Sequence, residues 1–386
     1  MTQPILPGAT IGVLGGGQLG RMFALAARRL GYRVHVLSSE PDSPAGQVAD
    51  HEIVAAYDDP DAVAELARGV DVVTLEFENV SAVAAAAADR HAPLRPAASV
   101  LHITQHRIRE KQFVRAAGVP LAPFEPVYSR DELHAAVGRI GLPAVLKTAA
   151  AGYDGKGQIR LETHADVEAA WHPSHAHEAV LETFVAFERE LSVIVARGCD
   201  GVMDCYGPFH NTHERHILDV SLLPAEAAER VSREAREIGF ALAERLELVG
   251  LLCVELFLTE DGRLLVNELA PRSHNSGHLT IEACATSQFE QHVRAVCGLP
   301  LGATTLRVSA AAMANLLGDL WAGGTPHWRA ALEQPGVALH LYGKREPRPG
   351  RKMGHLTVVD ATVAQARDAA LAARAAISPM TTRSAS

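Results

Sequence analysis

The chain of 386 residues lacks several features that mark whole classes of protein. Its formal net charge of −9 leaves no basic excess, so we expect neither nucleic-acid nor membrane-surface binding. Its five cysteines form an odd set without a CxxC pair, which argues against a disulfide framework or a zinc knuckle. No apolar run approaches the ~20 residues that span a bilayer, and no signal-peptide pattern is present. These absences favour the reducing cytoplasm.

The pattern of apolar runs predicts several domains. Short strands at 10–14, 33–37, 52–57 and 71–77 alternate with helices at 19–30 and 61–68, an order typical of a parallel sheet. Beyond a helix at 104–117, strands are expected at 144–148, 179–185 and 190–196, with a long amphipathic helix at 225–246. We therefore predict a parallel-sheet domain over 1–104, a second domain over 105–302 with a mobile lid at about 120–185, a β-rich domain over 303–376 and a tail over 377–386.

The third domain is expected to contain strands at 309–315, 338–342 and 354–359 and a helix at 363–375. In the second domain His210, His213 and His216 stand three residues apart, a spacing that could suggest zinc. They follow Gly207 and Pro208, so we interpret the segment as a loop without a metal site.

A glycine loop, GGGQLG at 15–20, lies where the first strand meets the first helix. Glycines let backbone amides approach an anion that a helix N-terminus also attracts. The pattern is compatible with a nicotinamide or flavin dinucleotide, with another phosphate, or with a tight turn that binds nothing. A dinucleotide site needs an acidic residue about 20 positions further on, and Glu40 does not settle that choice.

A second glycine loop follows Lys147, which is expected on a strand. The loop runs from Gly152 to Gly157 and carries its own lysine, so it can close over phosphates. It lacks the GxxxxGKS/T spacing of a Walker loop. The backbone after Glu182 could pair with an adenine edge and Glu190 could accept from ribose hydroxyls, although this stretch also fits an ordinary polar strand rim.

Two glutamates stand on a predicted hairpin of strands at 251–258 and 263–269. Antiparallel pairing about the turn at Asp261 and Gly262 brings Glu255 and Glu268 close together. Such carboxylates repel one another unless a cation lies between them, and Mg²⁺ prefers carboxylate ligands together with substrate phosphates. The pair therefore predicts a magnesium site.

These features together resemble the ATP-grasp superfamily, whose members make acyl-phosphates. The segments GGGQLGRM, TxExE (74–78), ITQHRxxxK, GYDGKGQ, ETFVxFxRELSVIxAR, NELAPRxHNSGH and GRKMGH resemble the N5-carboxyaminoimidazole ribonucleotide synthetases within it, in order along nearly the whole chain. The resemblance implies an α/β (α+β) ATP-grasp fold with an N-terminal Rossmann-like pre-ATP-grasp parallel-sheet domain and a small C-terminal β-rich domain. It also implies a homodimer.

The resemblance implies the site residues as well. ATP would be bound by Arg107, Lys147, Gly152, Tyr153, Asp154, Gly155, Lys156, Gly157, Gln158, Glu182, Thr183, Phe184, Val185, Glu190, His213, Asn267 and Glu268. The nucleotide substrate would contact Gly16, Gly17, Gln18, Leu19, Glu76, Tyr153, Asp154, Arg272, His274, Lys344, Arg351 and Lys352. Glu255 and Glu268 would hold Mg²⁺, for which Mn²⁺ is an accepted substitute. In this family the first glycine loop serves the substrate phosphate, which disfavours the dinucleotide interpretation.

The implied reaction is carboxylation of aminoimidazole ribonucleotide by bicarbonate and ATP through carboxyphosphate, in purine biosynthesis. The catalytic residues would be Lys147, Asp154, Arg272 and Lys352, with Asp154 as candidate base. Ser273, where proline is common, and the alanines at 149–151 depart from the family pattern and affect loop rigidity rather than reaction class. Two alternatives stay open: a formate-dependent glycinamide ribonucleotide transformylase and a nicotinamide-dependent oxidoreductase.

Overall fold

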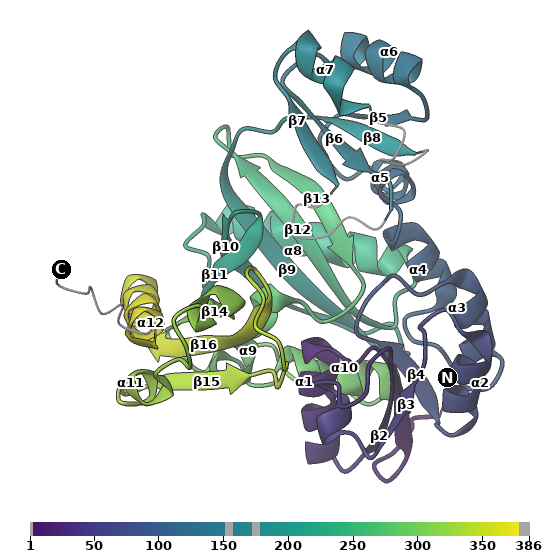
Figure 1. The fold of residues 1–386 in the computed structure, drawn as a ribbon, viewed down its shortest axis with the longest axis vertical. Helices are drawn as coiled ribbons and strands as arrows, with labels where there is room; N and C mark the ends of the chain where they lie inside the picture. The colour runs from purple at the N-terminus through teal and green to yellow at the C-terminus, as the bar shows by residue number, and fades with distance from the viewer. Residues whose placement is uncertain (1–2, 151–156, 172–177, 378–386) are drawn as a thin grey trace.

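The computed structural model describes residues 3–150, 157–171 and 178–377. Three sheets organise them: a four-stranded parallel sheet, a four-stranded antiparallel sheet and an eight-stranded sheet. Figure 1 shows a central body formed by β9–β13 and α8, the small antiparallel sheet above it, and the N-terminal and C-terminal parts on either side below. No helix within the described ranges is long and apolar enough to cross a membrane.

The N-terminal sheet confirms the expected parallel arrangement, with strand order β3-β2-β1-β4. Its strands β1, β2 and β4 are largely buried because helices cover both faces, as is usual for parallel sheets, whereas the edge strand β3 is partly exposed. One face packs on α1 and, from much later in the chain, on α10 (Gln288–Cys297); the other packs on α2 and α3. The bounds are β1 Thr10–Leu14, α1 Gln18–Arg29, β2 Arg33–Ser38, η1 Gly46–Val48, β3 His51–Val54, α2 Pro60–Arg68, β4 Val72–Leu75 and α3 Ala82–Asp89.

The helix expected at 104–117 is present as α5 (Arg107–Ala116), which begins three residues later, and a separate helix that was not expected, α4 (Ala98–Thr104), precedes it. The chain leaves helical geometry at His106, whose backbone is extended. The N–H of Arg107 then donates to the carbonyl of Ala149 at 2.8 Å. A contact with a distant loop thus starts α5 as a new helix, and no local sequence signal announces it.

A small antiparallel sheet follows α5, with strand order β5-β8-β6-β7. Helices α6 and α7 form a hydrophobic core of their own with this sheet. Figure 1 shows this unit standing above the central body, next to α5. The bounds are β5 Phe124–Val127, α6 Arg130–Ile140, β6 Ala144–Thr148, β7 Gln158–Leu161, α7 His164–Ala170 and β8 Ala179–Thr183.

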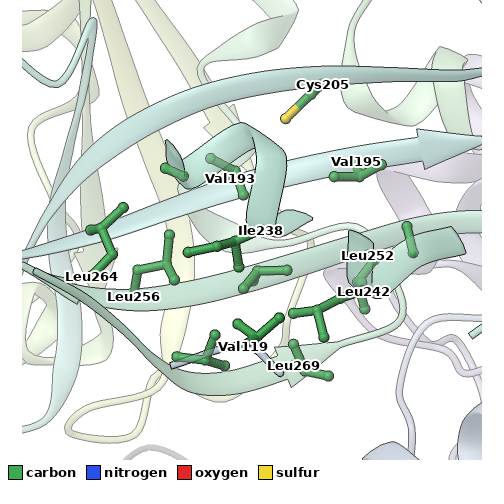
Figure 2. Close-up of a cluster of buried hydrophobic side chains, with 14 of the residues drawn as sticks. Val119, Val193, Val195, Cys205, Ile238, Leu242, Leu252, Leu256, Leu264 and Leu269 are labelled. Atoms are coloured by element: carbon green, nitrogen blue, oxygen red, sulfur yellow. The ribbon is translucent and has the colours of Figure 1, made fainter. Parts of the chain in front are cut away.

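The central part of the large sheet holds the main hydrophobic core. Alternate residues of β9 face opposite sides, so that Val193 and Val195 meet α8 while Ile194 packs on the other face. Figure 2 shows Leu242 and Ile238 of α8 lying over the strand side chains. The helix is shorter than predicted and begins at Glu229, since Glu226 has a left-handed backbone. The bounds are β9 Phe187–Arg197, β10 Met203–Glu214, β11 Ile217–Leu223, α8 Glu229–Arg245, β12 Gly250–Thr259, β13 Leu264–Ala270, η2 Asn275–Gly277 and α9 Thr280–Ala283.

The C-terminal strands do not make a sheet of their own. The order β13-β12-β9-β10-β11-β14-β16-β15 is continuous, because β14 pairs with β11 through Val220 and Ala314. The last helix, α12, covers one face of this extension. The bounds are β14 Ala310–Leu317, η3 Gly318–Trp321, α11 Trp328–Leu332, β15 Val337–Leu341, β16 Lys352–Asp360 and α12 Val363–Ile377.

The interpretation of the histidine segment as a loop is wrong, because His210 and His213 lie on β10. That strand pairs with β9 on one side and β11 on the other. Arg215 and His216 form the connecting turn with φ angles of 50° and 65°. Turns of this kind are usually built from asparagine and glycine, so the hairpin carried no readable signal.

Replacing Leu242 by alanine is expected to destabilise the protein by about 2–5 kcal/mol, because it leaves a cavity between α8 and the central sheet. Leu242 is 0% exposed, whereas Leu332 on α11 is 58% exposed, so Leu332→Ala is the matched control. Urea unfolding followed by circular dichroism measures both variants. Equal midpoints for the two would contradict this account of the core.

Candidate active site

The first glycine loop surrounds a carboxylate of the protein itself. The N–H groups of Gly17 and Gly20 donate to the two oxygens of Glu76, each at 2.6 Å. A Cβ atom on Gly17 would lie 2.2 Å from one of these oxygens, so a side chain there would displace the carboxylate. Burial raises the pKa of Glu76, and the two amides, Lys344 and Arg272 oppose that shift. The structure therefore brings Glu76 together with the loop predicted to bind the substrate; Gln18 and Leu19 open α1 beside them.

A half-buried ion pair joins the N-terminal part to the central sheet. The guanidinium of Arg272 donates through Nε and Nη2 to both oxygens of Glu78, at 2.5 and 3.2 Å. Burial by itself would raise the pKa of Glu78, but Arg272 holds it below its usual value. A further N–H of Arg272 reaches the carbonyl of Ser273 at 3.2 Å. Arg272 is thus fixed on two sides by groups that sequence reasoning did not place in the site.

The basic residues of the C-terminal part approach the same region. Lys344 donates to the carbonyl of Lys352 at 2.8 Å, and Arg351 donates to the carbonyl of Glu346 at 2.9 Å. The charge of Lys344 acts on Glu76 and that of Lys352 acts on His213. Lys344, near the C-terminus, is therefore close enough to Glu76, near the N-terminus, for its charge to affect the pKa of that carboxyl.

Lys147 lies in a buried cluster with a second lysine. Its ammonium is 3.1 Å from a Glu182 oxygen, and the ammonium of Lys111 is 3.0 Å from the same atom. Burial would raise the pKa of Glu182, but the two lysines lower it to about 2. Burial lowers the pKa of Lys147 in spite of this pairing. Lys111 is the last residue of the segment ITQHRxxxK and could have been found there.

The side chain of Glu182 forms ion pairs with Lys111 and Lys147. The sequence had instead suggested that the segment beginning at Glu182 contacts the adenine of ATP. Thr183 ends β8, and Phe184 lies in the connection to β9, where the guanidinium of Arg160 stacks 3.9 Å from its ring centre. Val185 follows in the same connection. Roles of these three residues toward ATP stay predictions.

The predicted ribose contact, Glu190, pairs with a histidine. Glu190 on β9 hydrogen-bonds to Nδ1 of His213 on β10. Burial lowers the pKa of His213, but the bond and charge of Glu190 outweigh it and the pKa is raised. Gln158, at the start of β7, lies 3.4 Å from a ring nitrogen of His216. Gly157 is described, whereas Gly152, Tyr153, Asp154, Gly155 and Lys156 lie outside the described residues.

The two candidate metal ligands are direct neighbours across β12 and β13, where Glu255 is in register with Glu268. Arg107 lies 3.1 Å from a Glu268 oxygen, and Nε2 of His274 lies 3.0 Å from a Glu255 oxygen. Burial opposes ionisation of Glu255, yet the hydrogen bond from His274 and nearby charges lower its pKa to about 2. Asn267 adds a buried side-chain oxygen without a hydrogen-bond partner. Oxygen atoms of this kind fit Mg²⁺.

No group of three or more histidine, cysteine, aspartate or glutamate side chains in the described ranges is arranged to hold a metal ion. The two carboxylates would therefore share an ion with the oxygens of a bound phosphate, as is usual for Mg²⁺.

An open pocket lies where the helices α4 and α5, the end of β6 and the end of β13 meet. Glu110 lines this pocket, and the sequence analysis did not identify it as a site residue. Its side chain is 2% exposed and accepts from the N–H of Leu269 at 3.0 Å. Burial and the neighbouring Glu268 raise the pKa of Glu110 to about 8. The pocket is lined by Glu78, Asn79, Thr104, Gln105, Arg107, Glu110, Ala149, Ala150 and Glu268.

Three family models match successive parts of the chain. The ribonucleotide synthetase preATP-grasp domain matches residues 8–105, the ATP-grasp domain matches 112–289, and the phosphoribosylaminoimidazole carboxylase C-terminal domain matches 311–369. The fold expected from the resemblance is confirmed by these matches and by the solved structures below.

Whole-chain relatives agree. An N5-carboxyaminoimidazole ribonucleotide synthase of Bacillus subtilis is 47% identical over 359 residues, which cover 92% of each chain. The crystal structure of an N5-carboxyaminoimidazole ribonucleotide synthetase with ADP superposes with a TM-score of 0.91 at 45% identity, covering 97% of this chain and 98% of that one. The Aspergillus clavatus enzyme with ADP and 5-aminoimidazole ribonucleotide gives a TM-score of 0.86 at 31% identity, covering 96% and 98%. The chain therefore belongs to the N5-carboxyaminoimidazole ribonucleotide synthase family of ATP-grasp ligases.

Proposed function

We propose that this chain uses ATP and bicarbonate to carboxylate the exocyclic amine of 5-aminoimidazole ribonucleotide. The products are N5-carboxyaminoimidazole ribonucleotide, ADP and phosphate. The observation that carries the proposal is one pocket wall formed by Arg107, Glu268 and Glu78, with Glu78 holding Arg272. A phosphate-binding group, a candidate metal ligand and a candidate carboxylate-binding group thus meet where three units of the fold join. The names of the relatives, and the ligands of the Aspergillus clavatus complex, support this choice of substrates.

In the first step an oxygen of bicarbonate attacks the γ-phosphorus of ATP. A new O–P bond forms, the bond to the bridging oxygen breaks, and ADP leaves carboxyphosphate behind. Lys147 and Arg107 would stabilise the charge on the phosphoryl oxygens, because fixed cations in an enclosed site need no reorganisation during the reaction. Glu182 and Glu268 hold these two cations in place.

Glu255 and Glu268 would hold Mg²⁺ or Mn²⁺ together with phosphate oxygens, supported by their cross-strand register. Bound there, the ion would supply positive charge to the phosphates during transfer. Because the carboxyl of Glu110 has a pKa of about 8, it is mostly neutral at pH 7 and adds little negative charge beside Glu268.

In the second step the amine nitrogen of the nucleotide attacks the carboxyl carbon of carboxyphosphate, so that a C–N bond forms, the C–O bond to the phosphate breaks and inorganic phosphate leaves. In the variant through carbon dioxide, the same C–O bond breaks first and the amine then attacks the released carbon dioxide. In both cases the base takes the proton that the amine loses. Arg272 would bind the carboxylate formed on the nitrogen. The second glycine loop, the one after Lys147, would exclude water when it closes. Asp154, with Lys352 as electrostatic partner, is the proposed base. The nucleotide would lie between Glu76 with the first glycine loop and the basic residues Lys344, Arg351 and Lys352. A homodimer in the cytoplasm is the proposed setting.

The proposed reaction predicts that ADP release from MgATP requires both 5-aminoimidazole ribonucleotide and bicarbonate. A coupled assay measures ADP in buffer with added bicarbonate and in buffer stripped of it under nitrogen. Glycinamide ribonucleotide with formate is the control for the related transformylase reaction. Turnover that ignores bicarbonate, or that occurs only with formate, would contradict the proposal.

Arg272→Lys is expected to lower kcat/KM for 5-aminoimidazole ribonucleotide by about a hundredfold, because lysine cannot reproduce the two-bond pairing with Glu78 or its fixed aim. The KM for MgATP should change little, since Arg272 is not among the proposed ATP contacts. Arg329→Lys, at a surface pair whose arginine is 91% exposed, is the matched control. An unchanged kcat/KM in Arg272→Lys would remove Arg272 from the proposed site.

Glu110→Gln is expected to stabilise the protein more at pH 8 than at pH 5.5. The folded pKa of Glu110 is about 8 against an ordinary value of 4.5, so its contribution to stability is complete below pH 4.5 and is lost as pH rises toward 8. Glutamine does not titrate, so the variant lacks this loss. Thermal unfolding midpoints at about pH 5.5 and 8 measure the difference, with the exposed Glu260→Gln as control. A difference that shrinks with pH would refute the raised pKa.

A further inference from the structure

A row of buried polar side chains crosses the central sheet and ends at Glu255. It begins at Ser221 on β11, passes through Asn211 on β10 and Ser192 on β9, and leaves the sheet at Ser276 of η2. Each of these four side chains is 5% exposed or less. Buried polar groups are costly unless their hydrogen bonds are made, so the row has a defined bonding pattern.

The hydrogen bonds of this row run in one direction. Ser221 donates its hydroxyl proton to Oδ1 of Asn211 at 2.8 Å, and Nδ2 of Asn211 donates to Oγ of Ser192 at 2.8 Å. The hydroxyl of Ser192 has therefore accepted one bond and can donate its proton to Oγ of Ser276, 2.9 Å away. Each acceptor in turn becomes the next donor.

The contacts of Ser276 determine which nitrogen of His274 carries a proton. The backbone N–H of Ser276 points at Nδ1 of His274 at 3.3 Å, and Oγ of Ser276 lies 2.9 Å from the same atom. A backbone amide can only donate, so Nδ1 is an acceptor, and its single lone pair is shared between this N–H and the hydroxyl of Ser276, which can donate to it. The ring proton is then on Nε2, which lies 3.0 Å from an oxygen of Glu255.

This assignment differs from the role expected for His274. The sequence resemblance placed it among the substrate contacts, yet both ring nitrogens already have partners inside the protein. The backbone of His274 is also held, because its N–H and carbonyl bond to the side chain of Gln288 at 2.9 and 2.7 Å. The ring is therefore fixed in position and pointed at Glu255.

We propose that Ser276 and Ser192 are positioning residues for Glu255. They hold His274 in the Nε2–H form, which donates to one oxygen of Glu255 and leaves the other oxygen for a divalent cation shared with the ATP phosphates. The cation part of this proposal rests on the function proposed above. Partners that orient a metal ligand typically change metal affinity by about 10- to 100-fold when they are removed.

The ring assignment is tested first on the metal-free protein, by the ¹⁵N chemical shifts of labelled histidine. The His274 signals are identified by their loss in His274→Asn. We expect the Nδ1 signal of an unprotonated nitrogen and the Nε2 signal of an N–H nitrogen. A proton on Nδ1 in the wild-type protein would overturn the proposal, and this result does not depend on any catalytic activity.

The positioning role is tested by Mn²⁺ binding in the presence of ADP, measured by electron paramagnetic resonance. Ser276→Ala should weaken Mn²⁺ binding by up to about tenfold, the lower end of the range for a direct partner of a metal ligand, because Ser276 acts on Glu255 only through His274. The affinity for ADP without metal should stay the same. Ser192→Ala should act in the same direction with a smaller effect, and it carries the test if Ser276→Ala does not fold. Thr357→Val is the matched control, since Thr357 is 0% exposed and its hydroxyl has no hydrogen-bond partner.

Wild-type Mn²⁺ affinity in both serine variants would overturn the positioning role. Failure of the proposed function is distinguishable from this outcome. Without bicarbonate-dependent ADP release, an intact Nε2–H assignment and a Mn²⁺ site weakened in Ser276→Ala would still establish the hydrogen-bond row as the support of a metal ligand.

Discussion

Carboxylates enclosed between separate units of a fold must meet cations or N–H donors from those units, since an uncompensated buried charge costs several kcal/mol. This constraint dominates the junction of the three parts of the chain. Glu182 on β8 lies between Lys111 of α5 and Lys147 of β6, and Glu78 after β4 is bound by Arg272 after β13. The pairs fix how the units approach one another, because each partner is supplied by a different element.

The same compensation prepares the junction for anionic ligands. Arg107 is held by Glu268 and Lys147 by Glu182, so both cations are already in place for the phosphate contacts that we propose. Preorganised charges of this kind are the main source of electrostatic catalysis. Glu268, which holds Arg107, is also one of the two candidate metal ligands. Glu110 avoids adding a further charge because burial keeps it largely protonated at neutral pH.

The continuous eight-stranded sheet is the support behind this arrangement. Its central strands carry Glu255 and Glu268, and its extension through β14 and β16 brings Lys352 to the same region. The row from Ser221 to His274 crosses three of its strands, β11, β10 and β9, before it reaches η2. Hydrogen bonding between the strands therefore fixes the candidate site residues relative to the hydrophobic core.

The sequence alone determined the strands whose apolar pattern is strong, the parallel N-terminal sheet, and the hairpin that puts Glu255 opposite Glu268, because each follows from local periodicity and turn chemistry. Family motifs then identified the reaction class. Tertiary structure alone decided the break between α4 and α5, the strand that carries His210 and His213, and the partners of Glu76, Glu78, Glu110 and Lys111. Those features depend on contacts between residues far apart in the chain, such as Arg107 with Ala149, and no local pattern encodes them.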